Sequence, residues 1–470
     1  MFRRVSGSAP DAVELHIDPP PGEWRAVVAP GAARAGRLPP PTHSDDVKRC
    51  RAALGLPTEG RIVMSGHQPG FWHPGILAKR IAAPTAAEAI SAEYAWLIVD
   101  QDEADITALR VPTRDGASGG SKGGALRAQT LRIGPEPTPG APACAAPSFI
   151  PGSVDTNAVH PAAKGGVRAI LEALRAHAEA PDGVAQVEAA SRDLLEGVAL
   201  PTRTLRATEL AGSDYFHTLL ARMRADPARC VATYNEAAAA FPDARIAPMA
   251  HDKRRGRWEL PLWRIVSGRR ERVWSDEIGP DAGELAPRAI LMTTIVRAAL
   301  CDLFLHGRGG IVYDRVAERW AGEWLGVRLA PMVCVSATLR LPLLDAPAPT
   351  PEQAARARWL AHHARHNPGA AGDAGLAQRK RELLRSIEND KAHGRDPASN
   401  YRALHELLDR HRRDNAEALA ALEQNADAAA SLLRDAAVAD DRTWAFPLHS
   451  AEALASLRDE IERAFSPLSG

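Results

Sequence analysis

Residues 61–99 decide the fold. They open with RIVMSG (61–66), a short apolar run ended by glycine, which is typical of a buried strand. After the turn HQPGFWHPG (67–75), Pro74 suits the first turn of a helix. A second apolar run, YAWLIV (94–99), follows that helix. A strand, a helix and a strand within roughly 40 residues predict two adjacent strands of a parallel α/β sheet.

The composition narrows the class of protein. Of the 470 residues, 45% are hydrophobic and 25% are charged, which is ordinary for a globular chain. Basic and acidic residues number 58 each, so the neutral chain lacks the basic excess of a nucleic-acid binder. We find no apolar run of membrane-spanning length and no secretory signal. Five scattered cysteines fit a reducing compartment. We therefore expect a cytoplasmic protein with no membrane or nucleic-acid partner and no metal site.

Composition also divides the chain. We expect a Pro/Gly-rich N-terminal segment at 1–60 and an α/β core at 61–345, with a loop-like Gly/Ala/Pro-rich excursion at 112–165. A helical arm at 346–440 and a final helix at 441–470, docked on the core, complete the division.

Within these parts the pattern predicts further elements. They are a hairpin at 256–275, helices at 293–304 and 311–325, a strand at 332–335, and arm helices at 352–366, 374–393 and 398–438. The last arm helix has a heptad seam of polar and small residues, which predicts an antiparallel pairing with 374–393. We expect the arm to support a homodimer.

The turn after the first strand is the first candidate site. It holds two histidines, a glutamine and two glycines at the start of a helix, with a lysine one turn further on: His67, Gln68, Gly70, His73, Gly75 and Lys79. Helix N-termini favour anions, glycine admits a phosphate close to the backbone, and imidazoles act as donors, acids or bases. The alternative is a tight turn in which the histidines only cap the helix.

The second candidate is the acidic segment after the second strand. Asp100 and Asp102, followed by Glu103, lie where open α/β sheets bind ligands. Such carboxylates hold ribose hydroxyls, amines or Mg²⁺. The alternative is a solvated acidic loop.

Two glycine-rich or hydroxyl-rich segments are further candidates. His306, Gly309, Gly310 and Tyr313 form a glycine-rich turn that leads into a helix, which suits an anion site or a sharp corner between helices. Hydroxyls and a guanidinium follow the later strand, and they suit a phosphate: Ser336, Thr338 and Arg340. The arginines of the hairpin at 256–275 are better explained as a solvated face.

These segments, in this order, resemble the cysteine-adding enzymes of bacillithiol biosynthesis. The likeness rests on Gln68-x-Gly70, the acidic run from Asp100, the Gly309-Gly310 turn before Tyr313, and Ser336-x-Thr338. The resemblance implies a Rossmann-like parallel core related to class I nucleotidyl transferases and a C-terminal α-helical coiled-coil arm. His73-Pro74-Gly75-Ile76 is also similar to three of the four positions of the HxGH motif, which binds ATP phosphates in that superfamily.

As a diverged member, the chain would join an amino acid or similar activated group to an amino-sugar acceptor. His73, Asp100 and His306 would be catalytic, the other candidates would bind substrate or nucleotide, and ATP or ADP would be the cofactor. We expect His67, His73, Asp100 and His306 to line one pocket. A glycan-modifying transferase and a non-catalytic ligand-binding scaffold are the alternatives. The motifs HExxH, GxGxxG and Walker A are absent from the sequence.

Overall fold

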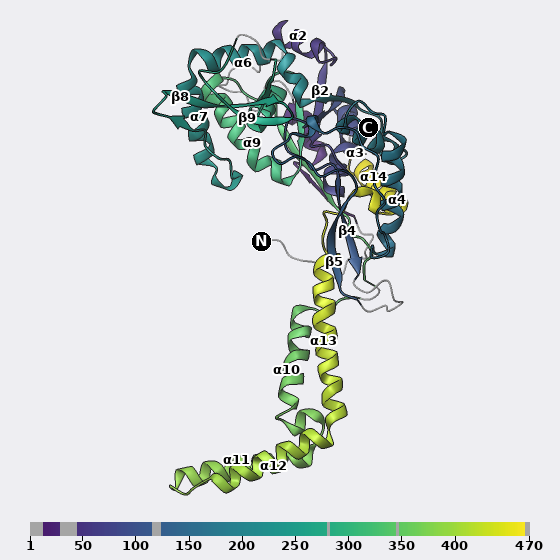
Figure 1. Cartoon of the computed structure of the whole chain (residues 1–470), viewed down its shortest axis with the longest axis vertical. Helices are drawn as coiled ribbons and strands as arrows, with labels where there is room; N and C mark the ends of the chain where they lie inside the picture. The colour runs from purple at the N-terminus through teal and green to yellow at the C-terminus, as the bar shows by residue number, and fades with distance from the viewer. Residues whose placement is uncertain (1–12, 29–44, 115–123, 280–282, 345–346, 466–470) are drawn as a thin grey trace. The chain divides into compact units, whose positions relative to one another are not determined.

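The computed structural model describes residues 13–28, 45–114, 124–279, 283–344 and 347–465 (Figure 1). The chain divides into two compact units. Unit 1 comprises residues 1–111, 129–341 and 442–470, and unit 2 comprises residues 112–128 and 342–441. Unit 1 has an α/β architecture, whereas the described part of unit 2 is mainly helical.

A six-stranded mixed sheet forms the centre of unit 1. Its spatial order is β1-β12-β11-β2-β3-β6. The strands are β1 (Glu14–Asp18), β2 (Arg61–His67), β3 (Ala92–Ile98), β6 (Arg203–Arg206), β11 (Leu303–His306) and β12 (Met332–Thr338). β2 pairs in parallel with β3, which confirms the prediction from residues 61–99. The pairs β3–β6, β11–β2 and β11–β12 are also parallel, and the edge strand β1 is antiparallel to β12.

The direction of winding reverses at β2. The chain continues from β2 to β3 and β6 on one side, and returns later to β11 and β12 on the other. In an open α/β sheet, the carboxyl ends of the two strands at such a reversal border the usual ligand crevice. Here those ends are His67 of β2 and His306 of β11.

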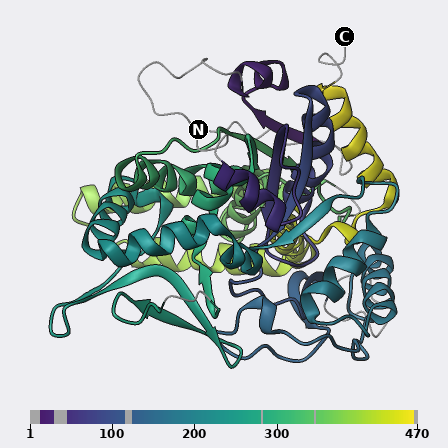
Figure 2. The same ribbon diagram turned by 90° about the horizontal axis from the view of Figure 1, so that it is seen from above.

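Alternating side chains pack the sheet between two hydrophobic layers. Val63, Trp96 and Leu305 pack with α3 (Pro74–Ala89) and α14 (Ala451–Phe465). α14 lies beside α3 in both views (Figures 1 and 2). Ile62 and Leu97 face the opposite layer. That layer contains α6 (Asp214–Ala225), α7 (Pro227–Ala240), α8 (Ala289–Ile295) and α9 (Arg308–Trp320).

Unit 1 contains further helices and strands, several of which add residues to these layers. They are α1 (Trp24–Val28), α2 (Asp45–Ala53), α4 (Pro161–Ala176), α5 (Gly183–Leu194), β7 (His251–Asp252), β8 (Arg257–Val266), β9 (Arg269–Trp274) and β10 (Leu285–Pro287). β8 and β9 form the predicted hairpin. Its turn residues Ser267 and Gly268 both have positive φ.

One central strand was not predicted. The helix expected at 293–304 ends earlier, because α8 passes into a π-helical turn at 296–300 and residues 303–306 form β11. Leu303 and Leu305 are wholly buried between neighbouring strands. A four-residue apolar run directly after a buried helix has no period of its own, so the sequence could not separate the two elements.

The predicted excursion at 112–165 is wrong in part. β4 (Ala108–Arg114) and β5 (Leu126–Arg132) form a two-stranded sheet, and α4 begins within the range. Four successive residues of β5 are exposed, so no buried alternation marked it as a strand. Residues 115–123 lie outside the described residues, as do 1–12 and 29–44 of the predicted N-terminal segment.

Unit 2 contains two helix pairs. α10 (Pro351–Ala364) packs along α13 (Ala416–Ala439), and α11 (Ala374–Ala392) packs along α12 (Ala398–Asp414) (Figure 1). The helix predicted over 398–438 is therefore broken at Asn415. The Asn415 side chain donates to the carbonyl of His411, and buried His411 Nε2 lies 2.8 Å from the carbonyl oxygen of Ala364. Self-association through these helices stays a prediction.

Two adjacent glycines of α4 provide a matched test of the packing. A Cβ on Gly166 would lie 2.0 Å from the carbonyl oxygen of Pro447, whereas a Cβ on Gly165 would meet nothing within 4 Å. We predict that Gly166→Ala lowers the free energy of unfolding by about 1–3 kcal/mol through overpacking. Gly165→Ala should raise it by about 0.5–1 kcal/mol through helix propensity. Urea denaturation measures both, and changes of the same sign would contradict the packing of α4 on residues 446–448.

Candidate functional site

The turn from β2 to α3 is held in shape by its own residues. Gly70 has φ of 149°, a conformation that favours glycine. Trp72 Nε1 donates to the carbonyl oxygen of Gln68 over 2.8 Å. His73 is the N-cap of α3, and its Nδ1 accepts from the backbone N–H of Gly75 over 3.0 Å. The helix-capping alternative is thus confirmed for His73.

Gly75 serves the contact between α3 and β12. A Cβ there would lie 2.9 Å from Ser336 Oγ and 3.0 Å from the carbonyl oxygen of Ala337. The space beside Gly75 is therefore filled by protein, and its role is close helix–strand approach. The same contact brings the His73 ring, 2.8 Å from that Cβ position, next to Ser336.

Lys79 places a buried amine beneath this turn. Its Nζ donates to the carbonyl oxygen of Gly66 over 2.8 Å and lies 5.5 Å from the centre of the Trp96 ring. No described carboxylate pairs with it, and burial lowers its pKa to about 8. Burial, with the charge of Lys79 and the neighbouring His73, lowers the pKa of His67 to about 3. His67 is thus neutral at physiological pH.

Two further cations, Arg442 and Arg308, lie near β12. Arg442 donates to Thr338 Oγ1 over 3.3 Å and to Ser336 Oγ over 3.4 Å, and both hydroxyl residues are buried. Burial, followed by the charge of Arg308, lowers the pKa of Arg442. Within the described ranges neither Arg308 nor Arg442 has a carboxylate in ion-pair contact.

We call Lys79, Arg308 and Arg442 the cationic cluster. Cys334 of β12 is within electrostatic reach of both Lys79 and Arg308, and Arg308 is within electrostatic reach of Arg442, so β12 links the three cations. Arg340, which we predicted to bind a phosphate, is instead paired with Glu14 over 2.6 Å. Sequence reasoning missed Arg442, because it follows α13 and no local motif ties it to β12.

The carboxyl end of β11 holds a histidine–carboxylate pair. His306 Nε2 lies 3.0 Å from Asp314 Oδ2 of α9. The same oxygen accepts from Thr293 Oγ1 over 3.0 Å and from Arg297 Nη1 over 2.9 Å. Burial alone would raise the pKa of Asp314, but His306 and these donors lower it. A Cβ on Gly310 would lie 1.9 Å from His306 Nδ1, so Gly310 is required for the ring's position. Gly309 has open space beside it.

His67 and His306 belong to opposite faces of the sheet. Leu305 is in register with Ser65, so the following residue, His306, aligns with Gly66, one place before His67. Because successive side chains alternate, His306 points to the α9 side and His67 to the α3 side. The structure therefore groups His67 with His73 and Lys79, and His306 with Asp314.

Asp100 belongs to neither group. Its two oxygens accept from the backbone N–H of Thr208 over 2.9 Å and from Thr208 Oγ1 over 2.7 Å. The side chain is fully buried, and burial raises its pKa. These bonds fix the segment after β6, and the catalytic role of Asp100 stays a prediction.

The acidic run that follows Asp100 is held by the hairpin. Arg270 of β9 pairs with Asp102 and Glu103, and it stacks over Trp263 at 4.6 Å. Gln68 Nε2 donates to the carbonyl oxygen of Glu103 over 3.1 Å. Tyr313 lies within electrostatic reach of Asp102 and Asp314, and burial raises the pKa of its phenol. These contacts join the turn after β2 and the hairpin to the acidic run after β3.

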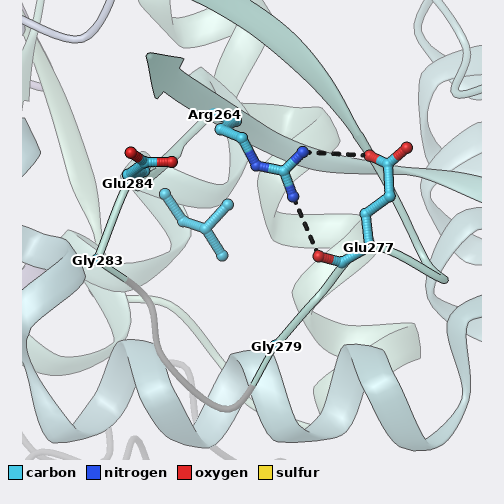
Figure 3. A pocket seen from close by; sticks show the side chains of 6 residues that line it. Arg264, Glu277, Gly279, Gly283 and Glu284 are labelled. Atoms are coloured by element: carbon cyan, nitrogen blue, oxygen red, sulfur yellow. Dashed lines mark hydrogen bonds and ion pairs between the residues drawn. The ribbon is translucent and has the colours of Figure 1, made fainter.

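A cleft of about 240 Å³ lies elsewhere, beside β8 and β10 (Figure 3). Its lining residues are Arg264, Glu277, Gly279, Gly283, Glu284 and Leu285. The Arg264 guanidinium bonds the side chain of Glu277 over 3.4 Å and its carbonyl oxygen over 3.0 Å. That cation is already neutralised, and none of the candidate residues lines the cleft. The sheet edge therefore stays the stronger candidate.

Comparison with known proteins found no family model and no curated protein that matches the sequence. None of the described helices is both long and apolar enough to cross a membrane. Among the described residues, no group of three or more His, Cys, Asp or Glu side chains is arranged to hold a metal ion.

Replacement of Lys79 by methionine tests whether its burial costs stability. The pKa of the folded amine is about 8, against 10.5 ordinarily, so the unfolded chain binds more protons between these pH values. Wild-type stability should therefore rise with pH across that window, and below it the burial cost is fully present. We predict that Lys79→Met is more stable than wild type at pH 7, by about 1–3 kcal/mol.

The advantage of Lys79→Met should shrink as the pH approaches 10.5. Denaturant titrations at several pH values measure it. Lys164→Met, which removes an exposed amine, is the control for loss of a charge. An advantage that stays constant with pH would contradict the inference that burial of the Lys79 charge destabilises the fold. A variant less stable than wild type at pH 7 would contradict it as well.

Proposed function

We propose that the chain is an enzyme that binds a phosphate-bearing ligand at the carboxyl edge of a Rossmann-like core. Two parallel strands lie on one side of β2 and two on the other, and the winding reverses at β2. This order supports a doubly wound nucleotide-binding core, whose ligands lie at that reversal. The helical pairs of unit 2 are compatible with the coiled-coil arm that the sequence resemblance implies.

The cationic cluster is the observation that carries the proposal. Lys79 and Arg442 are partly or wholly withdrawn from water without a carboxylate partner among the described residues. A buried unpaired charge is costly, and an anion would remove that cost. The starts of α3 and α9 lie at the same strand ends, where backbone N–H groups favour an anion. A nucleotide phosphate fits this combination.

The reaction that we propose is ligation of an amino acid or similar activated group to an amino-sugar acceptor, with ATP or ADP as the nucleotide. Arg442 and Lys79 would hold the phosphate, while Ser336 and Thr338 keep the Arg442 guanidinium in place. His306, oriented by Asp314, has the arrangement of a general base held by a carboxylate. His67, neutral at physiological pH, is a second proton acceptor on the α3 side.

Arg442→Gln tests the phosphate site. We predict that ADP and inorganic pyrophosphate bind wild type, and that the variant binds both at least tenfold more weakly through loss of a charge-assisted contact. Arg319→Gln is the matched control: it removes an arginine of α9 that is paired with Glu323, and it should bind like wild type. Isothermal titration calorimetry measures the affinities. Equal affinity in wild type and Arg442→Gln would exclude the cationic cluster as the phosphate site.

A further inference from the structure

Three exposed histidines lie close together in unit 2, at the end of α10. They are His362, His363 and His366. The ring centre of His362 lies 5.5 Å from that of His363 and 6.0 Å from that of His366. Imidazole is a preferred ligand of Zn²⁺, Cu²⁺ and Ni²⁺. Two of these rings that share one ion would form a metal site.

The His363 ring is held on Trp359, one turn earlier in α10. The two rings stack with their centres 4.0 Å apart, and His363 Nδ1 lies 3.0 Å from the carbonyl oxygen of Trp359. Since a carbonyl oxygen only accepts, Nδ1 of His363 is the protonated nitrogen and is not free to bind a metal. The orientation of the His363 ring is therefore fixed by its own helix.

His362 and His366 have the spacing of a pair that shares an ion. Residues i and i+4 lie on one face of a helix, and two histidines at this spacing bind Zn²⁺ in helical metal sites. α10 ends at Ala364, but the backbone N–H of His366 donates to the carbonyl oxygen of His363 over 3.0 Å. The helical turn thus continues as far as His366.

The distance between the two rings suits a shared ion. A metal–nitrogen bond of about 2 Å places the ion about 3 Å from each ring centre, so two rings that share it lie up to about 6 Å apart. The rings of His362 and His366, 6.0 Å apart, are at this limit. Because both side chains are exposed, small rotations bring both rings onto one ion.

The neighbouring charges favour the neutral form of His366. Its pKa is lowered by desolvation, followed by the charges of four neighbours: Arg412, His362, Lys380 and Arg365. A metal binds the neutral ring, so this shift lessens competition from protons. The cations also repel a metal ion, but Arg365 pairs with Glu423 over 2.6 Å and Arg412 pairs with Asp409 over 3.3 Å. Much of that repulsion is therefore offset.

We propose that His362 and His366 form a binding site for one transition-metal dication of the Zn²⁺ and Cu²⁺ class, with water in the remaining coordination positions. Mg²⁺ and Ca²⁺ do not suit it, because they prefer oxygen ligands. The site has two protein ligands, which agrees with the absence of metal-binding groups of three or more among the described residues. It lies in unit 2 and does not depend on the proposed phosphate site.

A bound ion would stabilise the turn that leads from α10 to α11. The carbonyl oxygen of His366 already accepts from Lys380 Nζ of α11 over 2.5 Å. An ion held by His362 and His366 would tie the same turn to the last part of α10. Zn²⁺ should therefore slow amide hydrogen exchange at residues 361–367 of wild type.

Metal titrations of the full chain and its variants test the site. By isothermal titration calorimetry, wild type should show a site for Cu²⁺ and Zn²⁺ that the double variant His362→Ala/His366→Ala lacks, with Cu²⁺ bound more tightly. Loss of an outer partner of a metal ligand costs about 10–100-fold in affinity, so either single variant should weaken this site at least about tenfold. Mg²⁺ should not bind there.

His363→Ala is the matched control, because it removes an exposed imidazole of the same turn whose Nδ1 is already engaged. It should bind Cu²⁺ and Zn²⁺ like wild type. All three histidines are exposed, so the variants should fold. Electron paramagnetic resonance of Cu²⁺ at this site should detect two imidazole nitrogens in wild type and in His363→Ala.

Equal binding of Cu²⁺ and Zn²⁺ by wild type and the double variant would overturn the inference. Loss of the site in His363→Ala, with His366→Ala unchanged, would overturn it as well, because the ion would then lie between His362 and His363. Slower amide exchange with Zn²⁺ in the double variant would show that the ion acts elsewhere in the chain, and would also contradict the proposal.

Discussion

β2 hydrogen-bonds in parallel to β3 on one side and to β11 on the other, and the rest of unit 1 is arranged around this double pairing. It sets the reversal of winding at β2 and brings the strand ends at His67 and His306 side by side. It also separates the two hydrophobic layers, because alternate residues of β2 pack against α3 and against the opposite helices. Without the β2–β11 pairing, the two histidines would have no common edge.

The edge that results holds both cationic side chains and buried oxygens that lack donors within the described part of the chain. Lys79 donates to a strand carbonyl on the α3 side, and Arg442 donates to the buried hydroxyls of Ser336 and Thr338, within electrostatic reach of Arg308. On the α9 side, Asp314 and Gln101 present buried oxygens without donors among the described residues. Both features cost folding free energy in the absence of a ligand. Destabilising groups of this kind concentrate where a fold binds ligands, and here they lie at one edge of the sheet.

The sequence was informative where a pattern was local. The apolar runs at 61–66 and 94–99 predicted β2 and β3, and Pro74 marked the start of α3. Prediction from the sequence failed where contacts between distant segments determine the secondary structure. β11 is only four residues long and directly follows a buried helix, and β5 is largely exposed. The break at Asn415 in the predicted long helix depends on contacts with His411, a residue of the expected seam.

In the candidate site, too, the sequence predicts contacts between residues close in the chain but not those between distant residues. His67, His73 and Lys79 lie on one short turn and helix, so their proximity could be predicted. Asp100 was assigned to the site because it follows a strand, yet Thr208, more than a hundred residues later in the chain, accounts for both its oxygens. Arg442 emerges only from the packing, because its partners Ser336 and Thr338 lie more than a hundred residues earlier in the chain.

The central claim is that the carboxyl edge around β2 binds an anion through the cationic cluster. A crystal structure of the chain grown with inorganic pyrophosphate tests this most directly. The account predicts pyrophosphate within hydrogen-bond distance of the Arg442 guanidinium and of Ser336 Oγ or Lys79 Nζ. Pyrophosphate bound elsewhere, with the edge occupied only by water, would contradict it.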